Sequence, residues 1–240
     1  MTIESDRLVS VMITVYDAAS YLAEAIDSVL AQTYRPFELI VLDDGTTDGS
    51  GEIARSYGSA LRFAQQKNAG LGAARNAALD LAEGRYYAFL DADDRFVPDK
   101  LERQMQILDA EPEIDMVFGH VTEFVSPEID ERARALLRDP VDDQPWRMPN
   151  LMLVRREAFH RVGPYSDTLR VGIGVDWYAR AVDEGLKEAV PPVVVLERRL
   201  HTSNNGIRQR DARHQYLQVL KQSLDRKRSA ERSTQPTGEA

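Results

Sequence analysis

Three carboxylates within four positions, at Asp91, Asp93 and Asp94, are the clearest candidates for chemistry in this chain. They follow Phe89 and Leu90, which the apolar pattern places at the end of a buried strand. Close carboxylates repel each other and lose hydration when partly buried, so a positive charge is needed to favour the group. Hard cations such as Mg²⁺ bind one or two carboxylates together with substrate phosphates. The pattern predicts a divalent-metal site, with Asp94 directed to a neighbour; helix capping or simple solvent exposure is the alternative.

Two other apolar runs also end in residues that could bind a nucleotide. Asp44 follows the run FELIVL, and a carboxylate at such a strand end can accept from ribose hydroxyls or a base N–H. The same segment, LDDGTTDGS, could instead serve only as a turn and helix cap. Thr14, Tyr16 and Asp17 follow the run VSVMITV, where Tyr16 either lies near a base or is a core aromatic.

The segment QKNAGLGAARN, which contains Lys67, Asn68, Gly70 and Arg75, could approach an anion. Its glycines allow close backbone approach at the start of a helix, where N–H groups favour negative charge. For Arg75 the alternative is a surface salt bridge. The chain has no Walker A pattern and no GxGxxG at the first turn, which disfavours ATP hydrolysis and NAD binding.

Two residues of the second half could complete a reaction centre. Asp176 follows two glycines and precedes Trp177, so its carboxyl could act as a general base or could only cap a helix. His201 follows the last predicted strand, beside arginines that could neutralise a diphosphate, and could bind a metal or a phosphate. A surface histidine in a basic turn is the alternative. The other three histidines have no comparable setting and are expected to be structural.

Alternating strands and helices must position these residues. Short apolar runs predict buried strands at 9–15, 37–42, 61–64 and 85–90. Helices are predicted after Ser20, which can cap the first of them, over 50–57 and 71–82, and after Pro98. This alternation predicts an α/β fold with a mostly parallel sheet covered on both faces. The strand-end aspartates should then gather at one edge, where ligands bind in such sheets.

The chain is less regular after residue 110. Strands are predicted at 116–124, 151–155 and 193–200, and helices at 156–162 and 176–184. Residues 126–149 are polar and contain four prolines, which predicts either an excursion that contains a helix or a mobile loop. Residues 211–228 are predicted to form an amphipathic helix with Tyr216, Leu217, Leu220 and Leu224 on its apolar side. The basic residues near its end permit a peripheral membrane contact.

Composition narrows the classes further. The 240 residues are 43% hydrophobic and carry a net charge of −9, which disfavours broad nucleic-acid binding. The absence of cysteine excludes disulfides and thiol catalysis. We expect no signal peptide and no transmembrane segment, and therefore a cytoplasmic protein.

Together the segments resemble glycosyltransferase family 2, whose members have the GT-A fold. The resemblance lies in ITVYDAASYLAEAIDSVLAQTY, LIVLDDGTTDGS, QQKNAGLGAARNAAL and YYAFLDADD, in the family's order, and continues more weakly to about residue 205. It implies a single GT-A domain over 1–228, with a Rossmann-like mostly parallel sheet. Residues 1–110 would bind the nucleotide-sugar, 111–210 would form the acceptor side, 211–228 the C-terminal helix, and 229–240 a disordered tail.

The resemblance also implies an activity and roles for the residues. The activity is inverting transfer of a sugar from a nucleotide-sugar, with UDP favoured, to an acceptor hydroxyl that the sequence does not identify. Asp91, Ala92 and Asp93 match the family's DxD motif, which binds Mn²⁺ or Mg²⁺; His201 matches a diphosphate or metal contact loosely; Asp176 matches the base. The nucleotide-sugar would be bound by Thr14, Tyr16, Asp17, Asp44, Lys67, Asn68, Gly70 and Arg75 together with the DxD residues.

The chain departs from the family pattern at two positions, and three other functions compete with sugar transfer. Val175 stands where many members have Glu, and Asp17 where many have Asn. Nucleotidyltransferases usually have a glycine-rich, basic loop after the first strand. The segment TVYDAASYL at that position has no such loop, so a nucleotidyltransferase is disfavoured. A non-catalytic nucleotide-sugar-binding protein, or an enzyme that needs a partner, would carry the same motifs.

Overall fold

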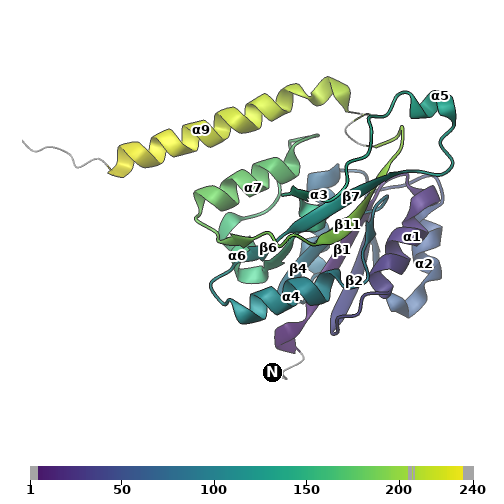
Figure 1. Ribbon diagram of the computed structural model, residues 1–240, viewed down its shortest axis with the longest axis horizontal. Coiled ribbons are helices and arrows are strands. Elements are labelled where there is room, and N and C mark those ends of the chain that lie inside the picture. Colours follow the sequence, from purple (N-terminus) through teal and green to yellow (C-terminus); the bar gives the residue numbers. More distant parts are fainter. Residues whose placement is uncertain (1–4, 205–206, 208, 235–240) are drawn as a thin grey trace, which may run out of the picture.

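The computed structural model describes residues 5–204, 207 and 209–234, which form a larger and a smaller β-sheet with flanking helices (Figure 1). The strands are β1 (Val9–Val15), β2 (Phe37–Asp43), β3 (Arg62–Gln65), β4 (Tyr86–Asp91), β5 (Arg95–Phe96), β6 (Met116–Val117), β7 (Gly119–Val125), β8 (Gln144–Trp146), β9 (Leu153–Arg155), β10 (Glu188–Ala189) and β11 (Val194–Leu200). The α-helices are α1 (Ala19–Leu30), α2 (Ser50–Ser56), α3 (Leu71–Leu81), α4 (Lys100–Ala110), α5 (Glu131–Arg134), α6 (Arg156–Val162), α7 (Ile173–Asp183) and α9 (His214–Thr234). Short 3₁₀ turns include Gly58–Ala60 and Pro149–Leu151.

The larger sheet confirms the predicted mostly parallel α/β architecture. Its strand order is β10-β6-β9-β4-β1-β2-β3, and only β9 runs antiparallel to its neighbours. The residues of β1 and β4 are almost entirely buried because helices cover both faces of the sheet. Right-handed crossovers place α1 and α2 on one face and α3 on the other.

The stretch predicted as one strand over 116–124 is divided between the two sheets. Residues of β6 pair with β9 and β10 in the larger sheet, whereas β7 pairs with β8 and β11 in the smaller sheet. Phe118 lies between them and is buried. The chain therefore changes sheet within one residue, and the smaller sheet, in the order β5-β11-β7-β8, is fixed beside the larger one.

The start of α1 differs from the prediction that Ser20 caps it. The helix begins at Ala19, and its first N–H groups are satisfied by the loop after β2 rather than by a local cap. The carboxylate of Asp48 accepts from the Ala19 N–H at 2.8 Å, and the Ser50 hydroxyl accepts from the Ala18 N–H at 3.1 Å. The β1–α1 and β2–α2 turns are therefore held together at one edge of the sheet.

The C-terminal helix α9 runs beside α7 and extends beyond the rest of the fold (Figure 1). The side chain of Val219 in α9 is buried, and Arg226 Nε of α9 donates to Asp183 Oδ2 of α7 at 2.7 Å. The helix continues to Thr234, past the predicted end at 228, and the rest of the predicted tail, 235–240, lies outside the described residues. Among the described helices, none has the length and apolar character that crossing a bilayer would require.

Candidate functional site

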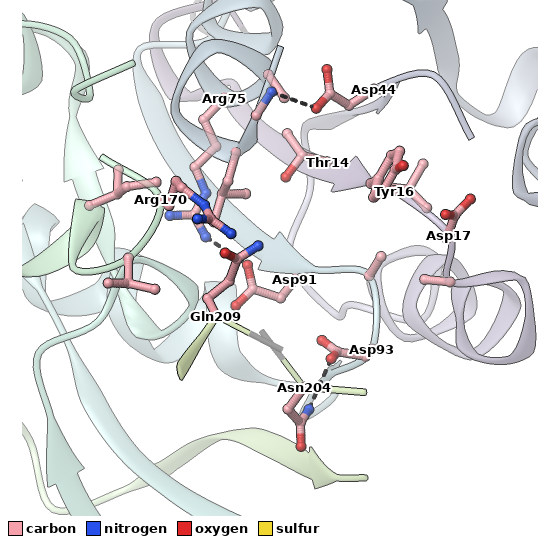
Figure 2. Close-up of a pocket in the computed structure, with 18 of the residues that line it drawn as sticks. Thr14, Tyr16, Asp17, Asp44, Arg75, Asp91, Asp93, Arg170, Asn204 and Gln209 are labelled. Atoms are coloured by element: carbon pink, nitrogen blue, oxygen red, sulfur yellow. Dashed lines mark hydrogen bonds and ion pairs between the residues drawn. The ribbon is translucent and has the colours of Figure 1, made fainter. Parts of the chain in front are cut away.

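An open pocket of about 1150 Å³ lies beyond the carboxyl ends of β1, β2 and β4 (Figure 2). The strand register explains its position, since Thr14 pairs with Asp91 and Val15 with Asp43, so these strands end side by side. The expected gathering of strand-end aspartates is confirmed for Asp17, Asp44, Asp91 and Asp93, all of which line the pocket. Thr14, Tyr16, Asn68, Gly70, Arg75, Ala92 and His201 line it as well.

Two neighbouring aspartates at the end of β2 have different surroundings. Asp43 is buried and accepts from the Thr46 N–H and from Gln65 Nε2, so it fixes the turn. Asp44 accepts from Gln66 Nε2 at 2.7 Å and from the N–H groups of Ala69 and Gly70 at 2.9 and 3.0 Å. Asp44 therefore positions the 66–70 loop as one wall of the pocket.

Asp91 is paired with a buried cation from α3. Arg75 Nη2 donates to Asp91 Oδ1 at 2.6 Å, and the arginine side chain is only 6% exposed. The alternative of a surface salt bridge at Arg75 is therefore wrong. The Asp91 side chain keeps about a third of its surface (32%) open to the pocket, so a ligand can reach it.

Asp93 is held from the other side by the segment after β11. His201 Nε2 lies 2.9 Å from Asp93 Oδ2. Asn204 Nδ2 donates to the same oxygen at 3.1 Å, as Figure 2 shows. Burial raises the pKa of the Asp93 carboxyl, but hydrogen bonding and charge from His201, together with a backbone hydrogen bond and the charge of Arg198, lower it below its usual value. His201 is itself buried, which excludes the surface-histidine alternative, and its Nδ1 has no hydrogen-bond partner.

Asp94 is directed to a neighbour, as predicted. It accepts from the Arg199 N–H at 2.9 Å and from Asn150 Nδ2 at 2.8 Å, and it is buried. Burial, followed by the charges of Asp93 and Asp91, raises the pKa of the Asp94 carboxyl well above its usual value. Asp94 therefore fastens β11 to the end of β4.

The donor set at this turn fits a divalent cation whose coordination a ligand completes. Asp91 and Asp93 present partly open carboxylates to one pocket, and Mg²⁺ characteristically uses one or two carboxylates plus substrate phosphates. Within the described part of the chain, no three acidic or histidine side chains are grouped so as to hold an ion alone. A metal here would therefore depend on oxygen atoms that the ligand brings.

Thr14 near the end of β1 and Tyr16 and Asp17 after it line one side of the pocket, and these three residues are called the ledge. Tyr16 is 49% exposed, so the alternative of a core aromatic is wrong. Asp17 has a left-handed backbone with φ 50° and accepts from the Thr47 N–H at 3.1 Å. This bond directs the ledge toward the β2 turn, and Thr14 lies at its base (Figure 2).

Lys67 and Asp176 are the predicted site residues that do not line the pocket. Lys67 is exposed in the 66–70 loop. Asp176 lies in the first turn of α7, which begins three residues earlier than predicted and has Gly172 as its N-cap. Its buried carboxylate accepts from Arg180 Nε at 3.1 Å. The preceding residue, Val175, does line the pocket.

Several lining residues were not singled out from the sequence, including Asp167, Arg170, Asn204 and Gln209. The 165–168 loop reaches the pocket because Asn76 of α3 exchanges two hydrogen bonds with the backbone of Tyr165, both at 2.9 Å. Gly72 permits this contact, since a Cβ there would lie 1.9 Å from the Ser166 carbonyl oxygen. The close approach expected at this glycine is thus to the protein's own backbone.

Comparison with known proteins places the chain among glycosyltransferases. The family model "Glycosyl transferase family 2" matches residues 10–170. An uncharacterized glycosyltransferase of Rickettsia prowazekii is 45% identical over 101 residues, which are 42% of this chain and 32% of the relative. The chain spans less than half the length of the curated relatives it matches.

Two solved structures are similar in fold. S. aureus TarS 1-349, solved in complex with UDP-GlcNAc, has a TM-score of 0.68 and 18% identity over 82% of this chain and 60% of that one. Mannosyltransferase PcManGT from Pyrobaculum calidifontis, in complex with GDP-Man and Mn²⁺, has a TM-score of 0.65 and 21% identity over 90% of this chain and 64% of that one. The mixed sheet with its strand-end pocket is thus the GT-A fold of glycosyltransferases. The chain belongs to glycosyl transferase family 2.

Proposed function

We propose that this chain transfers a sugar from a nucleotide-sugar, with UDP favoured, to an acceptor hydroxyl with inversion at the anomeric carbon. The observation that carries the proposal is the pocket at the ends of β1, β2 and β4, where Asp91 and Asp93 face a space also lined by Arg75 and Arg198. Arg198 Nη1 donates to Glu123 at 2.7 Å and still lines the pocket. Carboxylates and arginines together suit a diphosphate bound through a cation.

The nucleoside would lie over the ledge of Thr14, Tyr16 and Asp17, against the wall that Asp44 positions through Asn68 to Gly70. Lys67, which is exposed in the same loop, would contact the base from the solvent side. A divalent cation held by Asp91 and Asp93, with His201 beside it, would neutralise charge on the departing diphosphate. The arginines would hold the same group in place.

In the proposed reaction the acceptor oxygen forms a bond to the anomeric carbon as the bond to the diphosphate oxygen breaks. The acceptor proton passes to a carboxylate, and the nucleoside diphosphate leaves. We propose Asp176 as that base, on the family resemblance. Because its carboxylate is directed to Arg180, Asp167, which is exposed and lines the pocket, is the second candidate.

The first experiment measures thermal stability with UDP, GDP or dTDP, each with Mn²⁺, Mg²⁺ or EDTA. A ligand at about 100 times its Kd adds about 2.7 kcal/mol of stability. At about 2–4 °C per kcal/mol for a chain of this size, the melting temperature should rise by about 5–10 °C. The rise should need metal and should be lost in Asp93→Ala but kept in Asp80→Ala, an exposed aspartate of α3 outside the pocket. No rise with any nucleotide would contradict the proposal.

The base is tested by comparing Asp176→Asn with Asp167→Asn. The variant of the true base should keep the nucleotide-dependent rise in melting temperature and lose transfer by about 10²-fold or more. Loss of transfer in neither variant would refute both assignments. Donor binding without any product over a broad acceptor screen would favour a binding protein instead.

A further inference from the structure

Helix α9 exposes a stripe of leucines that no described part of the fold covers. Leu217, Leu220 and Leu224 are 70%, 58% and 54% exposed. Their spacing of three and four residues places them on one helix face, and the buried Val219 lies on another. An exposed apolar stripe of this length marks a contact surface. The amphipathic pattern predicted from the sequence is correct, but its apolar side does not face the core.

The leucine stripe is accompanied by positive charge. Lys221 follows Leu217 by one turn, and Lys227 and Arg228 lie three and four residues beyond Leu224, so all three cations flank the same face. Residues 211–228 contain five Lys and Arg residues and two Asp residues, whereas the whole chain contains 30 Lys and Arg residues and 39 Asp and Glu residues. This segment is therefore a cationic part of an acidic protein.

The stripe is continuous with the mouth of the pocket. Tyr216, one helical turn before Leu220, lines the pocket and packs against Gly172, where a Cβ would lie 3.2 Å from Tyr216 Cδ1. Val175, 45% exposed, lines the pocket from α7. A surface that covered the leucine stripe would therefore lie beside the opening of the pocket.

We propose that α9 lies on the surface of a bilayer that contains anionic phospholipid, with the leucine stripe among the acyl chains and the flanking Lys and Arg among the headgroups. A helix with an apolar face, a basic rim and low overall hydrophobicity binds membranes in this way. A second copy of the chain is a poorer occupant, because two such faces would bring cations against cations. The inference does not depend on the nature of the reaction in the pocket.

The test is co-sedimentation of the full chain with vesicles of phosphatidylcholine alone or mixed equally with phosphatidylglycerol. We expect binding to the mixed vesicles only, and weaker binding at about 1 M salt, where the screening length is about 3 Å. Lys221→Glu/Lys227→Glu should weaken binding by more than about 25-fold, since each cation near an anionic surface contributes about fivefold. The matched control is Arg132→Glu/Lys187→Glu, two exposed cations elsewhere.

The leucine stripe is tested separately. Leu220→Gln should weaken binding about tenfold, because a buried leucine side chain contributes at least that factor, and Leu136→Gln, at a leucine 69% exposed on another surface, should not. Equal binding to both kinds of vesicle, equal loss in the control variants, or no binding at all would overturn the proposal. A dimer in solution that Leu220→Gln dissociates, without vesicle binding, would assign the stripe to a second copy.

The arms of this test are separable from the donor-binding experiment. The α9 variants should keep the nucleotide-dependent rise in melting temperature, and Asp93→Ala should keep vesicle binding. Loss of vesicle binding in Asp93→Ala would contradict the inference, because that residue is distant in sequence and function from the leucine stripe.

Discussion

The pocket has two sides that are built in different ways. On the side of β1 and β2, polar groups are held by residues close in the sheet, as when Asp44 receives three hydrogen bonds from the neighbouring loop. On the opposite side, His201 and Asn204 reach Asp93 from more than a hundred residues away, and α9 leaves apolar side chains exposed. The first side is therefore pre-organised by the sheet, whereas the second depends on how the C-terminal segment packs.

Among the substitutions that test this difference between the two sides, Asp44→Ala is expected to cause the largest loss of stability. The change removes the carboxylate that accepts from the N–H groups of Ala69 and Gly70 and from the Gln66 amide, and a hydrogen bond to a charged group contributes about 1.5–3 kcal/mol. We expect about 3 kcal/mol of lost stability in urea unfolding, together with lost nucleotide binding. Asp17→Ala, which removes one bond on the same edge, should cost less than about 1 kcal/mol. Similar losses for the two variants would show that the β2 side is not pre-organised by Asp44.

A somewhat smaller effect is expected where the two sides meet, at Gly72. Replacing a helical glycine by alanine normally stabilises a protein by up to about 1 kcal/mol. Here the new Cβ would clash with the Ser166 carbonyl, so Gly72→Ala should destabilise by about 2 kcal/mol and move the 165–168 loop. The urea midpoint measures the first effect, and the affinity for a nucleotide-sugar the second. A stabilised variant would show that this loop yields easily and does not fix the pocket.

The smallest effects concern the two faces of α9. Val219→Ala should lower the free energy of unfolding by about 1.6 kcal/mol, since two buried carbons are removed at about 0.8 kcal/mol each. Leu220→Gln, on the exposed face, should change it by less than about 0.5 kcal/mol. Thermal unfolding of both variants in the absence of lipid distinguishes them. An equal loss at Leu220 would mean that the stripe is covered within the protein.

The β1 and β2 side of the site could be predicted because its signals are local. A buried apolar run followed by an aspartate identifies a strand end, and parallel strands bring those ends together, as observed for Asp44 and Asp91. The roles of the predicted residues in binding and catalysis stay predictions. Asp176 shows the limit, because its position in the sequence does not reveal that its carboxylate is directed to Arg180.

The other side could not be predicted because its positions depend on distant contacts. Nothing local to Asp167 shows that Asn76 of α3 draws its loop to the pocket. Ser20 has the residue type of a helix cap, yet Asp48 from another turn takes that role. Leucine spacing identified α9 as amphipathic, but periodicity alone does not tell which face of a helix finds a partner within the chain.

The change of sheet at Phe118 has a consequence for unfolding. Because β6 and β7 are joined by a single buried residue, the smaller sheet cannot open without pulling on the larger one. Asp94 adds a second link, since it joins the end of β4 to β11 through the Arg199 N–H. Amide hydrogens of β7 and β11 should therefore exchange with solvent through the same global opening as those of β1 and β4, as one cooperative unit.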